Sequence, residues 1–272
     1  MRTVRFELLR PQEIVQERAR CPVVYIPLGP LEWHSLHMPF GTDGLNATAL
    51  ALQTAERVGG VVLPTFFWGT ERERSPQQAQ ALGFDADEWL IGMDFPNHLL
   101  KSLYCREEFL ALLLRELLTM VLELRYKIIV LVNGHGATNQ IATLERLTAE
   151  FNACSPARVL LVTAAPPGAD RASLGHADAL ETSLMMAAHP DCVAIEDLPP
   201  VPQPLHYRDW GIVDSEAFDG HPTQDFTLRS EADPRRQASA DKGRQAYQQM
   251  VASLEEMVRL TLRALGQEET SA

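Results

Sequence analysis

Short apolar runs along this chain alternate with longer segments in which apolar residues recur every three or four positions. Apolar runs that end at Gly, Pro or Asn are typical of buried strands, and they predict strands over 23–28, 61–63, 128–132 and 159–162. Helical spacing predicts helices over 45–58, 106–124, 141–152 and 235–265. Strands that alternate with helices predict a three-layer α/β/α fold, in which a mostly parallel sheet is covered on both faces.

Two segments depart from this alternation. Residues 66–104 are aromatic and Pro-containing, and excursions of that length in compact domains often line binding sites, so a lid or a pocket-lining insertion is expected. Residues 198–234 are rich in Pro and are expected to wrap the surface. Because the chain has no internal repeat and no low-complexity tract, a single domain over 1–272 is the simplest organisation.

Charge and cysteine content narrow the range of partners. With 24 basic and 36 acidic side chains, the formal net charge of -12 repels nucleic acids and anionic membranes. The first residues carry no apolar run typical of a secretory signal, and no later run reaches the ~20 apolar residues of a membrane helix, so a cytoplasmic protein is expected. The cysteines form no CxxC pair, which is typical of reduced thiols. Any metal must therefore be held by His and carboxylate side chains.

A first group of polar residues follows the first predicted strand. The stretch EWHSLHMPFGTD, residues 32–43, contains Glu32, His34, His37 and Asp43. Ligands collect at the carboxyl ends of parallel strands, and carboxylates combined with imidazole suit a catalytic Zn, Mn, Fe or Ni ion. The alternative is a solvated loop in which these groups cap helices and bond to the backbone.

Two further segments place polar residues at similar points. In NGHGATN, residues 133–139, two glycines allow a tight turn at the end of a strand, which would present His135 at the strand's end rather than pack it in the core. The alternative is a simple turn in which His135 caps the following helix. In GHADALETSLMM, which begins at Gly175, His176 and Glu181 precede an apolar helical stretch. There, Glu181 could serve only to interact with the helix dipole.

Together, the three segments resemble the creatininase family of metal-dependent hydrolases. The family pattern reads E-x-H-G-x-H-x-P-x-x-T-D, then NGHGGN, then H-A-x-x-x-E-T-S-L-M. Here EWHSLHMPFGTD, NGHGATN and HADALETSLM appear in the same order. The resemblance covers most of residues 21–193, with a weaker echo in DPRRQASADKGRQAY near the C-terminus.

The resemblance implies a metal centre with one or two divalent ions, Zn, Mn or Fe. Its implied ligands are Glu32, His34, Asp43, His135 and Glu181. Asp43 would bridge two ions. In creatininase itself, a Glu two residues after the NGH histidine also binds metal, whereas this chain has Ala137 at that position. The second site is therefore either completed by Glu181 or weakened.

Other residues stand beside these ligands in the family pattern. His176 matches a histidine with a proton-transfer role, and a hydrogen-bonding role next to a ligand is the alternative. His37 matches a histidine that is not a direct ligand, so a supporting position is expected. Trp33 replaces the usual Gln and either stacks on a flat substrate or packs the loop, and Ser35 replaces the usual Gly. The histidines without motif support, expected to pack or to lie on the surface, are His98, His189, His206 and His221.

The activity that the resemblance implies is hydrolysis of a C–N bond in a small amide, with a cyclic amide expected first, by water that the metal activates. Cleavage of a C–C bond in a cyclic ketone and deformylation of a formamide are alternatives within the family. A non-catalytic binding protein of the same fold is the alternative outside enzymes. The resemblance also implies a homo-oligomer, such as a hexamer. Because residues 66–104 lack the H-x-x-F-P-G-T stretch of many family members, the resemblance does not identify the substrate.

Overall fold

Four parallel strands form the centre of this computed structural model, which describes residues 3–89, 92–169, 175–213 and 227–271. The strand order is β2-β1-β3-β4, and every neighbouring pair is parallel. The strands are β1 (Val23–Leu28), β2 (Val61–Val62), β3 (Ile128–Asn133) and β4 (Arg158–Thr163). All four predicted strands are thus confirmed, to within one residue at each end.

Helices alternate with the strands along the chain. The helices are α1 (Pro11–Arg20), α2 (Thr42–Val58), α3 (Pro76–Leu82), α4 (Glu107–Glu123), α5 (Thr138–Cys154), α6 (Ala179–Ala188), α7 (Tyr207–Trp210), α9 (Pro234–Gln237) and α10 (Ala240–Ser271). The segment predicted as one helix over 235–265 consists of two, α9 and α10. They are separate because Ala238, which follows α9, has an extended backbone conformation.

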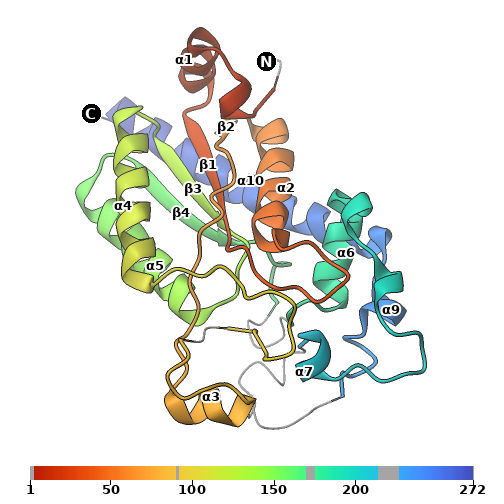
Figure 1. Cartoon of the computed structure of the whole chain (residues 1–272). Helices are drawn as coiled ribbons and strands as arrows, with labels where there is room; N and C mark the ends of the chain where they lie inside the picture. The colour runs from red at the N-terminus through yellow and green to blue at the C-terminus, as the bar shows by residue number, and fades with distance from the viewer. Residues whose placement is uncertain (1–2, 90–91, 170–174, 214–226, 272) are drawn as a thin grey trace.

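The sheet is covered by helices on both faces (Figure 1), and the alternation of side chains along the strands divides the core in two. Val23 and Tyr25 pack with α2, α6 and α10, whereas Val24 and Ile26 pack with α4 and α5. Because β1 and β3 are buried on both faces, they read as continuous apolar runs in the sequence. The predicted three-layer α/β/α fold with a parallel sheet is therefore confirmed.

The ends of β1 and β3 lie at the same level, because the last residues of the two strands pair with each other. The loops that follow both approach the first turn of α2, where Asp43 lies. A Cβ atom on Gly134 would lie 2.0 Å from the Asp43 carbonyl oxygen, and one on Gly29 would lie 2.5 Å from the Asp43 Cβ. Neither Gly134 nor Gly136 has a positive φ. The chain passes from β3 to α5 through residues 134–137 without a left-handed glycine, and Gly134 is required by its close backbone packing against Asp43.

The Pro-rich segment expected to wrap the surface contributes to a third cluster of buried side chains. In its described part, Leu198 and Leu205 are buried in contact with a group that includes Met185 of α6. The stretch between them is exposed at Pro200, Pro202 and Pro204, so the described part runs along the surface as expected and is anchored by the apolar residues on either side of the prolines. Residues 214–226 of the segment, with His221, lie outside the described residues.

The longest helix, α10, packs against α6 and α2 on one face of the sheet (Figure 1). A Cβ atom on Gly243 of α10 would lie 1.9 Å from the Ser183 carbonyl oxygen of α6, so only glycine allows this approach. Gly266, near the end of the same helix, would meet nothing within 4 Å. Within the described residues, no helix has both the length and the apolar character needed to cross a membrane.

Gly243→Ala is expected to lower the free energy of unfolding by about 1–3 kcal/mol, because the added methyl group overpacks the contact between α10 and α6. Gly266→Ala is the matched control, since it adds the same methyl group to an exposed position and gains up to about 1 kcal/mol of helix propensity. Denaturant unfolding followed by circular dichroism measures both values. Equal effects of the two substitutions would contradict close packing at Gly243.

Candidate metal centre

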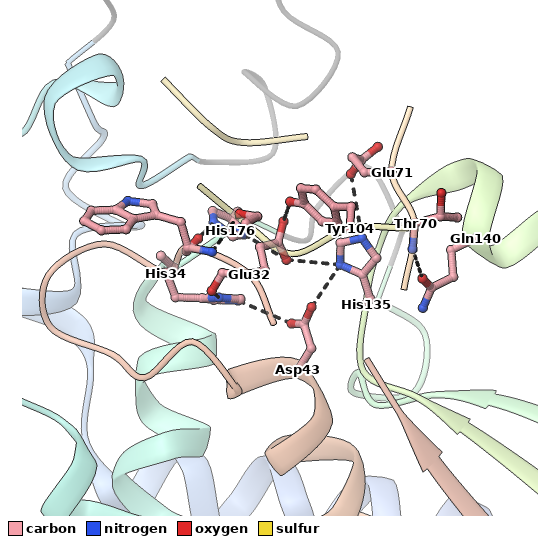
Figure 2. A network of polar contacts seen from close by, with 12 residues as sticks. Glu32, His34, Asp43, Thr70, Glu71, Tyr104, His135, Gln140 and His176 are labelled. Carbon is pink, nitrogen blue, oxygen red and sulfur yellow. Dashed lines mark hydrogen bonds and ion pairs between the residues drawn. The ribbon is translucent and has the colours of Figure 1, made fainter. Parts of the chain in front are cut away.

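Six polar side chains that are far apart in the sequence converge beyond the carboxyl ends of β1 and β3, and all of them except Glu181 are labelled in Figure 2. They are Glu32, His34, Asp43, His135, His176 and Glu181. The first two belong to the loop after β1, the third to the first turn of α2, and the fourth to the loop after β3. His176 precedes α6, and Glu181 lies in its first turn. Five of the six residues are at most 4% exposed, whereas the Glu181 side chain is 21% exposed.

Asp43 is shared by two groups of potential metal ligands. One group consists of Glu32, Asp43 and His135, and the other of His34, Asp43 and Glu181. In the first, His135 Nδ1 lies 2.9 Å from Asp43 Oδ2 and 3.1 Å from Glu32 Oε2. In the second, His34 Nε2 lies 3.3 Å from Asp43 Oδ1 and 3.6 Å from Glu181 Oε2. The two oxygens of one carboxylate therefore face two different groups.

Several of these facing atoms lack hydrogen-bond partners. Among the described residues, none forms a hydrogen bond with Glu32 Oε2, Asp43 Oδ2 or His34 Nε2, although all three atoms are buried. A buried polar atom without a partner costs about 1–3 kcal/mol in proteins, so such atoms rarely occur without a ligand. Imidazole nitrogens and carboxylate oxygens without thiolates form the donor set of catalytic Zn, Mn and Fe sites. The residues present therefore fit a divalent ion in each group.

The charges of the centre also favour a cation. Burial raises the pKa of Asp43, but the neighbouring His34 and His135 outweigh burial and hold this pKa well below its ordinary value. Burial, together with the charge of Asp43, raises the pKa of Glu181 to about 8 against the opposing effect of His34. Burial lowers the pKa of His34, yet Asp43, Glu181 and Glu32 raise it to about 10. With these pKa values, His34 is protonated and Glu181 is largely neutral at pH 7, so the site holds protons where a bound cation could take their place.

His176 has a defined tautomer. Its Nε2 donates a hydrogen bond of 2.6 Å to the Trp33 carbonyl oxygen, which can only accept, so the proton is on Nε2. Its Nδ1, 3.9 Å from Glu32 Oε2, then carries the lone pair of the neutral ring. Burial lowers the pKa of His176 to about 3, with a further contribution from His34 and against the opposing charge of Glu32. At neutral pH, His176 is therefore an uncharged base that faces the centre.

The two supporting residues expected from the sequence lie outside the ligand groups. His37 Nε2 is 2.9 Å from Thr182 Oγ1, so it links the loop after β1 to α6, next to Glu181. Trp33 is buried, stacks on His98 with ring centroids 4.6 Å apart, and donates its indole N–H to the Trp210 carbonyl oxygen at 3.4 Å. This arrangement favours the alternative in which Trp33 packs the loop.

Two residues beside the centre were not expected from the sequence. Both come from the excursion over 66–104 (Figure 2). The Tyr104 hydroxyl donates a hydrogen bond to Glu32 Oε1. Glu71, which is 2% exposed, places its Oε2 3.8 Å from His135 Nε2. No motif spacing connects them with the ligands, and the aromatic and charged character of the excursion was the only available signal.

A pocket opens beside the two ligand groups, between the carboxyl ends of β3 and β4 and the first turn of α6. Its walls away from the ligands are small and mostly apolar, and they include Ile141, Ala164, Ala165, Leu180 and Leu184. Glu32, Asp43, His135, His176 and Glu181 line the same pocket. A small molecule in it would contact the ligand groups and His176 at once.

In sequence and in structure, this chain is similar to proteins described as creatininases. The family model "Creatininase: Creatinine amidohydrolase" matches residues 7–258. A mutant creatininase complexed with creatine has a TM-score of 0.64 and 21% sequence identity, covering 96% of this chain and 99% of that chain. For the structure described as creatininase Mn the TM-score is 0.63, the identity is 21%, and the coverage is again 96% and 99%. A mutant creatininase described as Zn-Zn type has a TM-score of 0.63 and 20% sequence identity, covering 96% of this chain and 99% of that chain. A search of curated proteins finds no match.

Ser35, which follows His34, has a strained backbone conformation. It has a φ of 63°, in the left-handed region that favours glycine, and its buried hydroxyl has no hydrogen-bond partner among the described residues. Ser35→Gly is therefore expected to raise the free energy of unfolding by about 1 kcal/mol. Ser253→Gly, on the exposed face of α10, is the control and should lower it by about 0.5 kcal/mol. Chemical denaturation measures the free energy of unfolding of both variants. A Ser35→Gly protein that is less stable than the wild-type protein would refute the strain at Ser35.

Proposed function

The chain belongs to the creatininase family, and from that premise we propose that it is a divalent-metal hydrolase that cleaves a C–N bond in a small amide, with a cyclic amide as the first expectation. The observation that carries the proposal is the sharing of Asp43 between two ligand groups, next to a pocket that also exposes the neutral base His176. A non-catalytic binding protein would need neither a bridging carboxylate nor such a base.

Two ions are proposed per chain. The first would be held by Glu32, Asp43 and His135, and the second by His34, Asp43 and Glu181. The position of Glu181, 3.6 Å from His34 Nε2, supports its role as the ligand that completes the second site where creatininase uses the Glu that is Ala137 here. Zn and Mn are the preferred ions, because solved relatives are described with each, and Fe also matches the donor set.

Divalent ions at these positions would polarise the substrate carbonyl and lower the pKa of water toward ~7. The residues of the chain supply the rest of the reaction. His176 takes a proton from the attacking water on Nδ1 and delivers it to the leaving nitrogen, while the Trp33 carbonyl holds the ring through Nε2. The apolar walls formed by Ile141, Leu180 and Leu184 exclude water around the substrate.

Further properties of the whole protein belong to this proposal. A single domain over 1–272 in the cytoplasm, with residues 66–104 lining the active site, is the organisation that we propose. A homo-oligomer is supported by a stripe of exposed apolar side chains on α4, formed by Phe109, Leu112 and Met120. A monomer in light scattering would contradict the oligomer without affecting the proposed chemistry.

Metal analysis of purified, metal-loaded protein tests the two sites separately. The wild-type protein is expected to hold about two ions per chain, Glu181→Gln about one, and Asp43→Asn none, because only Asp43 belongs to both groups. Glu150→Gln, on the exposed face of α5, is the control and should keep both ions. Wild-type protein that holds no metal after loading with Zn²⁺ or Mn²⁺ would refute the proposed centre.

His176→Asn is expected to retain both ions and to lower kcat by about 10²–10⁴-fold, because it removes the proton carrier and leaves the ligands in place. The assay is a panel of cyclic amides, formamides and cyclic ketones, with products identified by mass spectrometry. His189→Asn, at the end of α6 and outside the pocket, is the matched control. Unchanged turnover in His176→Asn would contradict the proposed role of His176 in proton transfer. A product formed from a cyclic ketone would show that the enzyme cleaves a C–C bond instead of the proposed C–N bond.

A further inference from the structure

We infer that Glu71 and Tyr104 are positioning residues, which orient His135 and Glu32 for the first metal ion. The inference rests on the proposed function, since it concerns the ion that Glu32, Asp43 and His135 would hold. It assigns to the 66–104 excursion a task beyond lining the pocket, namely that of setting the affinity of one metal site.

The contact between Glu71 and His135 involves the side of the imidazole that faces away from the other ligands. Nδ1 of His135 faces Asp43 and Glu32, and Nε2 faces Glu71 Oε2 at 3.8 Å (Figure 2). His135 Nε2 and Glu71 Oε2 are both buried, and neither has a hydrogen-bond partner among the described residues. The other Glu71 oxygen already accepts a hydrogen bond of 2.7 Å from the Arg72 backbone N–H. Oε2 is therefore the atom of Glu71 that is available to His135.

A carboxylate in this position determines which imidazole nitrogen can bind a metal. When Nε2–H donates to Glu71, the proton is retained on Nε2 and the lone pair of Nδ1 is directed toward Asp43 and Glu32. The negative charge of the acceptor also makes the imidazole a stronger donor to a metal. Closing the distance from 3.8 Å to a hydrogen bond of about 3 Å requires only a small side-chain shift.

Tyr104 acts on Glu32 in the same way. Its hydroxyl donates to Oε1 of Glu32, which leaves Oε2 as the oxygen that faces Asp43 and His135. Two ligands of one site are thus each contacted from outside by a residue of the same excursion.

Packing joins these two contacts to each other. A Cβ atom on Gly92 would lie 2.4 Å from the Tyr104 hydroxyl oxygen and 2.8 Å from Glu71 Cγ, so the Gly92 backbone abuts both side chains. The Thr70 N–H, next to Glu71, donates to Gln140 Oε1 at 2.8 Å. Gln140 in turn donates to Asn133 Oδ1, and the Asn133 side chain donates to the His135 carbonyl oxygen. The excursion is thereby tied to the backbone that carries His135 as well as to its side chain.

The test measures Zn²⁺ affinity in a Glu181→Gln background, where the first site is expected to be the remaining one. In this background, Glu71→Ala should weaken Zn²⁺ binding by about 10- to 100-fold, and Glu71→Gln by less, because the amide oxygen still accepts a hydrogen bond without charge. Tyr104→Phe should weaken binding in the same range. The controls are Glu73→Gln, an exposed residue of the same excursion, and Tyr126→Phe, a buried tyrosine away from the centre. Neither control should alter the affinity.

A second readout separates positioning from a general structural effect. In the ¹H–¹⁵N NMR spectrum of the Zn²⁺-loaded protein, the Nε2 proton of His135 should appear at the low field typical of a hydrogen bond to a carboxylate, and Glu71→Ala should move it upfield.

Equal Zn²⁺ affinity of the Glu181→Gln parent and of Glu71→Ala in that parent would overturn the inference. Equal weakening by Glu71→Gln and Glu73→Gln would also overturn it, since charge alone would then suffice. If Glu71→Ala does not fold, the Zn²⁺ affinities of Glu71→Gln and Tyr104→Phe test the inference in its place. If the Glu181→Gln parent binds no Zn²⁺ while the wild-type protein does, the assignment of the first site is refuted and the metal centre is not. If the wild-type protein also binds no metal, both the first-site assignment and the proposed metal centre are refuted.

Discussion

The position of one buried carboxylate governs this site. Asp43 faces His135 with one oxygen and His34 with the other, so every proposed metal ligand is arranged around it. It reaches this position because α2 begins where the ends of β1 and β3 meet, and because Gly29 and Gly134 have no side chains that would push the helix away. Two close backbone contacts at glycines are thus a precondition for this arrangement of side chains.

The buried charges around Asp43 support the proposal that the site binds a cation. Three carboxylates and two imidazoles are packed into a nearly dry volume, and several of their facing atoms lack hydrogen bonds within the described residues. Such an arrangement is costly unless a cation compensates it. His176 lies at the edge of this charged group as a neutral base, fixed through the Trp33 carbonyl. In the proposed mechanism, metal binding and proton transfer would belong to different residues.

Much of this arrangement could be predicted from the sequence, for physical reasons. The strands were readable because β1 and β3 are buried on both faces and are therefore apolar throughout. The convergence of Glu32, His34 and His135 followed from their places after strand ends, since parallel strands bring their carboxyl ends to one edge. The separate roles of these residues as ligands were implied by a family resemblance and not by spacing.

Other features depend on contacts that no local pattern encodes. Glu71 and Tyr104 reach the centre only because of the path of a long excursion without periodicity, and Gly92 holds them together from its interior. The contact of Trp33 with His98 likewise joins residues from two loops. Glycine in the NGH segment was correctly taken as significant, but close packing against Asp43 could not be distinguished from a turn without the path of α2.

Anomalous diffraction from crystals of the protein grown with Mn²⁺ or Zn²⁺ tests the central claim most directly. The account predicts two anomalous peaks about 3.5–4 Å apart on either side of Asp43, one next to Glu32 and His135 and the other next to His34 and Glu181. If crystals grown with saturating metal show one peak that does not contact Asp43, or no peak in this region, the proposed two-ion centre is contradicted.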